Sequence, residues 1–198
     1  SQTLEGKEKV YQVQTVRDKA RQIELYVQGY VAQVGAYARA FEIGGSLPAA
    51  ATHAGQDHLA RTLEEDTNLI ALAVAPRAGV SSFAANAGKI SNEETQALLG
   101  EAAAATRGGR PYLGEPRIIR SSLEPAFVVA HPVKHYRAPG EARGTDGVVM
   151  AVIGLQKVFG VVAQRGNLDE NQLLHGEQAV FFVVDGDGTA VAHPDQQL

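Results

Sequence analysis

Several side chains between residues 110 and 134 have the chemistry of an anion-binding site. A guanidinium offers a planar fork of N–H donors that matches a carboxylate with two hydrogen bonds, and a tyrosine adds an oriented hydroxyl. Such groups on one face of a sheet, roofed by a helix at His58–Asp66, would make a small pocket for an anion. The candidates are Arg110, Tyr112, Arg117, Arg120, His131 and Lys134. We therefore predict a binding site for a small carboxylate in this region.

For each of these residues the alternative is an ordinary strand position that faces solvent. Successive side chains of a strand point to opposite faces, so alternation sends half of any such set outward. Arg110 and Tyr112 are two residues apart and would share one face of a strand. These two are therefore favoured over the other candidates.

Other patterns match metal-binding or catalytic motifs only in part. His131 and His135 have a spacing that suits a metal site on a helix, but Pro132 and the strand character of the segment oppose it. Three aspartates have the composition of a calcium loop without its closing glutamate: Asp185, Asp187 and Asp195. No glycine-rich phosphate loop, nucleophile elbow or catalytic triad can be assembled. We predict no metal, no cofactor and no catalytic residue.

Composition limits the class of protein further. The chain has 198 residues, enough for one domain or slightly more, and its 44% apolar content supports a core. A net charge of -4 gives no basic surface for nucleic acid. No run of about 18 apolar residues could span a membrane. The absence of cysteine is compatible with an oxidising compartment. The polar, abrupt ends suggest a piece excised from a longer protein.

The elements that would position the site begin with a long helix. Apolar residues alternate at spacings of three and four from Val13 to Phe41, which predicts one uninterrupted helix from Leu4 to Phe41. This seam could pack on the chain's own domain or form a coiled coil with a second copy, and both readings stay open. A homodimer would use Val13, Val16, Ala20, Ile23, Val27, Tyr30 and Val34.

After a glycine-rich stop, turn residues and apolar runs predict an alternation of helices and strands. The His53–Asp57 stretch is expected to be loop, followed by a short helix at His58–Asp66. Leu69–Ala75 reads as a buried strand, and Val80–Ala85 as its antiparallel return. A capping box of Ser91 and Glu94 opens a helix that ends at Ala105, before two glycines.

The second half of the chain adds more strands. We predict strands at Tyr112–Arg120, Ala126–Val133 and Val148–Leu155, then a helix at Gln156–Gln164. Apolar runs on either side of Asp185–Gly188 predict a hairpin of Ala179–Val184 with Thr189–His193. The fold class is therefore α+β, with a long N-terminal helix, an antiparallel five-stranded sheet and a C-terminal hairpin.

This order of elements resembles the Cache family, the PAS-like extracytoplasmic sensor domain of bacterial chemoreceptors and sensor histidine kinases. Residues 68–74 are similar to the family's first strand, and residues 110–113 to its Arg-x-aromatic-aromatic segment. Residues 126–132 and 148–158 resemble its fourth and fifth strands. The most specific piece is Phe181–Asp195, similar to a hairpin that opens the membrane-proximal lobe of two-lobed members.

The resemblance implies a periplasmic sensor domain of an inner-membrane receptor, joined to the membrane only through flanking transmembrane helices that are missing here. It divides the chain into a signalling helix (1–45), a ligand-binding lobe (46–166) and a truncated or vestigial second lobe (167–198). The output module, whether kinase, cyclase or chemoreceptor, does not follow from it.

The resemblance also bears on the ligand. Amino-acid-binding members have an aspartate near the end of the fifth strand that meets the ligand ammonium, whereas this chain reads Ile153-Gly154-Leu155-Gln156 there. The second aromatic of the family segment is replaced by Leu113. A small organic acid such as acetate, propionate, pyruvate or lactate is therefore expected in preference to an amino acid. The alternative is an α+β enzyme or carrier domain that uses Arg110, His131 and His135 on a small acid.

Overall fold

The computed structural model describes residues 2–44, 52–78, 80–134, 144–163, 183–184 and 190–192. The chain divides into two compact units, Ser1–Gln28 with Gln156–Leu198, and Gly29–Leu155. The boundary between them falls within the first helix. The predicted division at residues 45 and 166 is a functional one and stays a prediction. All six predicted site residues lie in the unit Gly29–Leu155.

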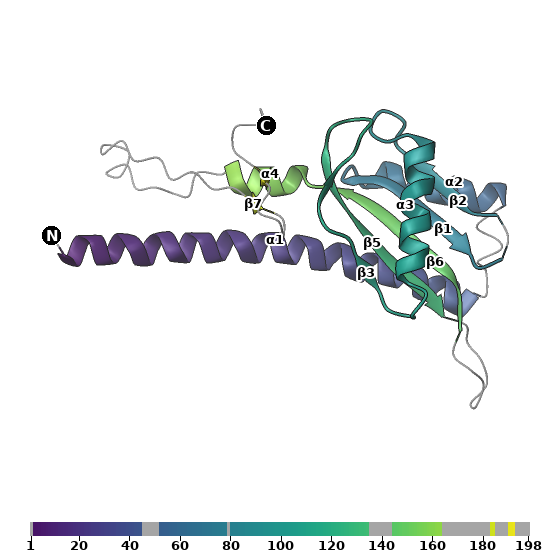
Figure 1. Ribbon diagram of the computed structural model, residues 1–198, viewed down its shortest axis with the longest axis horizontal. Coiled ribbons are helices and arrows are strands. Elements are labelled where there is room, and N and C mark those ends of the chain that lie inside the picture. The colour runs from purple at the N-terminus through teal and green to yellow at the C-terminus, as the bar shows by residue number, and fades with distance from the viewer. Residues whose placement is uncertain are drawn as a thin grey trace. The chain divides into compact units, whose positions relative to one another are not determined.

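An antiparallel sheet forms the centre of this unit, as predicted (Figure 1). Its strand order is β2-β1-β6-β5-β3, with β4 also paired to β5. The long apolar runs of the sequence become the central strands, because only a fully covered strand can bury both of its faces. The strands are β1 (Leu69–Pro76), β2 (Ser82–Ala85), β3 (Tyr112–Leu113), β4 (Arg117–Ile118), β5 (Pro125–Lys134) and β6 (Thr145–Gly154).

Helices cover both faces of the sheet. Figure 1 shows α3 (Asn92–Ala105) on the near side, with α2 (His53–Glu65) and the part of α1 (Gln2–Gly44) from Gly29 onward on the far side. Pairing fixes which side chains share a face, since His131 lies opposite Val149 while Ala130 lies opposite Met150. Odd-numbered residues of β5 therefore face α1, and even-numbered residues face α3.

The α3 face combines alanines with larger apolar side chains such as Val128, Met150 and Val152. Ala71, Ala73, Ala126 and Ala130 are fully buried there against Ala102 of the helix. The predicted capping box is only half formed: Ser91 caps Glu94 N–H, but the Glu94 carboxylate accepts from Arg120 N–H and from the Ser121 hydroxyl. The Ser121 hydroxyl in turn accepts from Ser91 N–H at 3.1 Å. The start of α3 is therefore tied to the turn after β4.

The apolar seam of α1 has two different environments. Tyr30 and Val34 are buried, at 7% and 1% exposure, and the Tyr30 ring meets Phe127 of β5 edge to face. Val13 and Val16 are about half exposed. The prediction that Tyr30 and Val34 serve a dimer seam is therefore corrected, because both are covered by this chain's own sheet.

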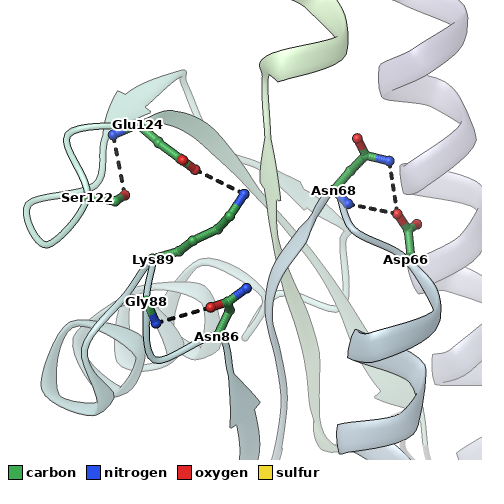
Figure 2. A network of polar contacts seen from close by, with 7 residues as sticks. All are labelled: Asp66, Asn68, Asn86, Gly88, Lys89, Ser122 and Glu124. Carbon is green, nitrogen blue, oxygen red and sulfur yellow. Dashed lines mark hydrogen bonds and ion pairs between the residues drawn. The ribbon is translucent and has the colours of Figure 1, made fainter.

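The second helix begins earlier than predicted. Residues 53–57, expected to be loop, form the first turn of α2, because the Thr52 side chain accepts from Gly55 N–H and caps it. Beyond the helix, Asp66 accepts from the backbone and the side chain of Asn68 (Figure 2). The other oxygen of Asp66 accepts from the Tyr30 hydroxyl at 2.8 Å. One carboxylate therefore links α1 to the turn between α2 and β1.

A second group of polar contacts in Figure 2 closes the turn between β2 and α3. Asn86 accepts from Gly88 N–H through its side chain, which is a local Asx turn. Lys89 forms an ion pair with Glu124 at 3.3 Å, and Ser122 accepts from Glu124 N–H. These contacts fix the edge of the sheet next to β4.

One predicted strand is divided in two. Tyr112–Arg120 was expected to be continuous, but β3 and β4 are separated by residues 114–116. Pro116 has no N–H to donate to a ladder, and Gly114 N–H already pairs with Val128 O outside the regular strand. The break leaves Tyr112 and Arg117 as the two strand residues opposite Ala130 and Ala126.

In the other unit the structure describes α4 (Gln156–Ala163) and two paired strands, β7 (Val183–Val184) and β8 (Ala190–Ala192). The predicted helix and the strands of the predicted hairpin are confirmed at these residues. Its Asp-Gly turn lies outside the described residues. No helix in the described part of the chain is long and apolar enough to cross a membrane.

Candidate functional site

Two of the predicted residues meet on the α3 face, where they hold a carboxylate of the chain itself. Arg117 donates from Nη2 to Glu101 Oε1 at 2.6 Å and from Nη1 to Oε2 at 2.9 Å. The Tyr112 hydroxyl donates to Glu101 Oε1 at 2.8 Å. A forked guanidinium and a phenol around one carboxylate are the arrangement that was predicted for a ligand. We call these three residues the Arg117–Tyr112–Glu101 cluster.

The acid–base properties of the cluster agree with this geometry. Hydrogen bonding to Arg117 lowers the pKa of Glu101 and raises that of Arg117. Burial, and then the hydrogen bond to Glu101, raise the pKa of Tyr112, so its hydroxyl stays protonated and available as a donor. At neutral pH the cluster is an ionised pair with a neutral phenol beside it.

Two further details give this cluster an unusual environment. A side chain on Gly114 would place its Cβ 3.1 Å from the Tyr112 hydroxyl, so the glycine leaves room for the phenol. Arg117 Nε is buried and has no hydrogen-bond partner among the described residues. The guanidinium therefore keeps one donor that Glu101 does not use.

Arg110 and Arg120 lie near the cluster in sequence but do not join it. Arg110 is exposed and precedes β3. The Arg120 side chain is also exposed, and only its backbone N–H is used, in the contact with Glu94. A shared strand face was one reason to favour Arg110, and it fails because Arg110 lies outside β3. The similarity of residues 110–113 to the family segment was the other reason, and it stays a prediction.

His131 lies on the opposite face of the sheet, beneath α1. Its imidazole hydrogen-bonds with the backbone of Val31, and burial lowers its pKa. A Cβ on Gly35 would come within 2.9 Å of the imidazole Cε1, so the helix packs directly on the ring. The ring is therefore a spacer between β5 and α1, and Nε2 is buried without a partner among the described residues.

Lys134, the last predicted residue, is exposed at the end of β5. Its backbone N–H donates to Glu42 of α1 at 2.8 Å. The structure thus brings Tyr112 and Arg117 together, leaves Arg110, Arg120 and Lys134 exposed, and places His131 on the other face. Their ligand-binding role stays a prediction.

A small hollow of about 250 Å³ lies between the sheet and helices α1 and α2. Its described lining carries no lysine or arginine and consists of Tyr37, Ala40, Phe41, His58, Leu59, Thr62, Leu72 and Val149. The predicted pocket was to combine the helix at His58–Asp66 with the strand cations. Those two features lie on opposite faces of the sheet, because Leu72 and Val149 point away from α3.

Glu101 is the site residue that the sequence analysis missed. It precedes the last turn of α3, and none of the residues three or four positions away on the helix is basic. A glutamate without a basic neighbour on its own helix can pair with a cation from elsewhere in the fold, and this is the one signal that the sequence offers.

Other sequence patterns fall partly outside the described residues. His135, Asp185, Asp187 and Asp195 are among the residues whose structure is not described. Within the described ranges no three His, Asp or Glu side chains gather in an arrangement that could hold a metal ion. The enzyme alternative requires Arg110 and His131 to act together. Arg110 is exposed beside β3, whereas His131 lies beneath α1 against Gly35, so the two do not form one site.

Comparison with known proteins shows which solved structures share this architecture. No protein-family model and no curated protein matches the sequence. Solved structures do match. The ligand-binding domain of the Pseudomonas fluorescens chemoreceptor CtaA, in complex with L-serine, is 17% identical with a TM-score of 0.59, over 92% of this chain and 70% of that one.

Two domains from Pseudomonas aeruginosa PAO1 match similarly. The amino acid chemoreceptor PctC, in complex with GABA, is 20% identical with a TM-score of 0.59, over 93% of this chain and 75% of that one. The chemoreceptor PctB, in complex with L-Gln, is 19% identical with a TM-score of 0.60, over 94% of this chain and 68% of that one. The predicted Cache-type α+β architecture is therefore confirmed, and this chain has the fold of the ligand-binding domains of bacterial chemoreceptors.

Proposed function

We propose that this chain is the extracytoplasmic ligand-binding domain of a transmembrane signalling receptor, either a chemoreceptor or a sensor kinase. The observation that carries the proposal is the likeness to chemoreceptor domains over more than nine-tenths of the chain. The long helix supports it, because α1 is continuous over 43 residues and its residues Tyr30, Val34 and Ala38 are buried. An enzyme or carrier domain has no need for such a helix.

Signalling would depend on that buried contact. Gly35 lies against His131, and Tyr30 lies against Phe127, so β5 and α1 touch directly. A ligand that binds one arrangement of the sheet better than another shifts the equilibrium toward it, and this difference in affinity bounds the signal. Any change at β5 is then passed to the helix that packs on it.

We further propose that the ligand is a small monocarboxylate, of the size of acetate, propionate, pyruvate or lactate. The end of β6 at Ile153 and Leu155 is buried and apolar and carries no carboxylate, and the one carboxylate beside Arg117 and Tyr112, that of Glu101, is already held by those two residues. A buried ammonium without acceptors costs several kcal/mol. The amino acids and GABA bound by the compared domains are therefore expected to bind poorly here.

The cation-bearing face of the sheet is the better place for this ligand. The hollow beside α2 has no guanidinium or ammonium in its described lining, so an acid bound there would leave its charge unpaired. Arg117 and Tyr112 already show the geometry that satisfies a carboxylate. Arg117 thus takes the role for which Arg110 or another strand cation was proposed from the sequence.

We also propose that the intact receptor is a homodimer through the N-terminal part of α1. The seam residues Val13 and Val16 are about half exposed, and Val10 is more exposed still. A second copy in register would cover this apolar stripe as an a/d seam. The interface would be shorter than the sequence predicted, since Tyr30 and Val34 are already used.

A ligand panel tests the function and the ligand class. Calorimetry should detect acetate, propionate, pyruvate or lactate, with L-serine, L-alanine and GABA weaker by roughly 30-fold or more, the scale of one unpaired buried polar group. Fusing the chain to a chemoreceptor signalling module should make kinase output depend on the same acid. Tight binding of an amino acid would overturn the ligand class, and a silent fusion that still binds the acid would overturn the sensor role.

A further inference from the structure

The Arg117–Tyr112–Glu101 cluster contains a carboxylate whose only described polar partners lie outside its own helix. Glu101 belongs to α3, while its three hydrogen bonds come from β3 and β4. None of the residues three or four positions from Glu101 on α3 is basic, so its charge has no stabilising partner on its own helix. The stability of α3 therefore does not explain the place of this side chain.

The groups that receive this carboxylate have the form of a recognition site. The two Nη atoms of Arg117 meet the two oxygens one to one, and the Tyr112 hydroxyl adds a third donor to Oε1. Gly114 provides the space that the phenol needs to reach that position. Arg117 Nε remains a buried donor without an acceptor among the described residues. The guanidinium therefore has donor capacity that Glu101 leaves unused.

The contact is also weak enough to be exchanged. Side-chain exposure is 44% for Glu101 and 33% for Arg117, so water screens the pair. A simple exposed ion pair contributes up to about 1 kcal/mol, and the forked geometry with a third donor raises this contact above that value without making it permanent. What keeps Glu101 in place is mainly its tether to α3, which gives it a high effective concentration.

We propose that Arg117 and Tyr112 form a carboxylate-binding site that Glu101 occupies as a tethered substitute, and that a small monocarboxylate competes with Glu101 for it. The choice of a small monocarboxylate as the ligand rests on the proposed function. Ligand binding then releases the C-terminal end of α3 from β3 and β4. The affinity measured for the wild-type chain is lowered by the fraction of time that Glu101 fills the site.

The test compares acetate binding to the 198-residue chain and its variants by calorimetry, at constant ionic strength in sodium chloride. Glu101→Gln removes the competing charge, so acetate should bind about tenfold or more tightly than to the wild type. Glu93→Gln is the matched control, because it removes the same charge from an exposed position in the first turn of the same helix. It should bind acetate as the wild type does, and acetamide should bind to none of them.

A second variant shows whether acetate binds at Arg117 itself or binds more tightly only because a negative charge has been removed. Arg117→Gln in the Glu101→Gln background should abolish acetate binding, whereas Arg107→Gln, at an exposed position after α3, should leave it unchanged. Thermal unfolding of each variant shows whether it is folded. If Glu101→Gln unfolds, Glu101→Asp provides the same comparison, because its shorter carboxylate does not span the three donors.

The outcomes distinguish this inference from the proposed function. Equal acetate affinity in the wild type and the Glu101 variants, or binding that survives Arg117→Gln, overturns the inference while a carboxylate sensor can still stand. Acetate binding that appears in Glu101→Gln and vanishes with Arg117→Gln supports the inference, even if no acid changes the output of the receptor fusion. If acetate binds at Arg117 but no acid changes the receptor output, the proposed sensor function is wrong while the inference about the binding site stands.

Discussion

Two glycines of α1 offer a direct test of how the helix meets the sheet. A Cβ at Gly35 would lie 2.9 Å from His131 Cε1 and 3.3 Å from both ring nitrogens. A Cβ at Gly29 would meet nothing within 4 Å. The two positions are on one helix, so the intrinsic gain from glycine to alanine is the same at both.

The magnitudes follow from this difference. Glycine costs about 1 kcal/mol relative to alanine in a helix interior, so Gly29→Ala should raise the free energy of unfolding by up to that amount. Gly35→Ala gains the same term but forces the imidazole or the helix to move, and overpacking of this kind costs about 1–3 kcal/mol. The two variants should therefore differ by about 1–3 kcal/mol in favour of Gly29→Ala.

Urea unfolding followed by circular dichroism measures this difference, and a change of 1 kcal/mol corresponds to roughly 2–4 °C in Tm for a chain of this size. His131→Ala removes the clashing ring, so adding Gly35→Ala in that background should stabilise the chain as Gly29→Ala does. Equal stabilisation by Gly29→Ala and Gly35→Ala in the native background would refute the close contact between α1 and β5.

Two further predictions concern the same helix. His131 has a lowered pKa in the folded chain, so the unfolded state binds its proton first; stability should be full above the ordinary histidine pKa of about 6.5 and fall as pH drops below it. His131→Gln should flatten this slope in urea titrations at pH 5 to 8, and an unchanged slope would assign it to other groups. Val34→Glu buries a charge at a 1% exposed site and should unfold the chain, whereas Val16→Glu should leave the fold intact and abolish self-association measured by ultracentrifugation. A folded Val34→Glu chain, or a Val16→Glu chain that still self-associates, would contradict this division of the seam.

Much of the fold follows from local sequence signals. The apolar run from Leu69 to Ala75 ends at Pro76 and the turn after it, and the strand ends there too. Ser91 caps α3 as its sequence predicts. These features are predictable because each depends on residues within a few positions of one another. The start of α2 was missed because Thr52 follows a glycine- and alanine-rich stretch that also resembles loop.

The arrangement of the site was less predictable, for a physical reason. Which face a strand residue occupies depends on pairing register, and Arg117 lies opposite Ala126, on the face of Tyr112, only because the register shifts by one residue between β3 and β4. A shift of one residue would have moved Tyr112 to the face of His131. The partner of Arg117 comes from Glu101 on a separate helix, so the composition of the strands could not reveal it.

The alanines beneath α3 limit how this domain can change. Ala71, Ala73, Ala102, Ala126 and Ala130 are already the smallest side chains that carry a Cβ, and all are fully buried. At these five positions a substitution that enlarges the space must therefore introduce glycine, which weakens a strand or a helix. A larger residue at any of them would push α3 outward. Variants that accept bulkier acids should consequently arise in the segment between β3 and β4, and the sheet–helix spacing should remain nearly constant as specificity diverges.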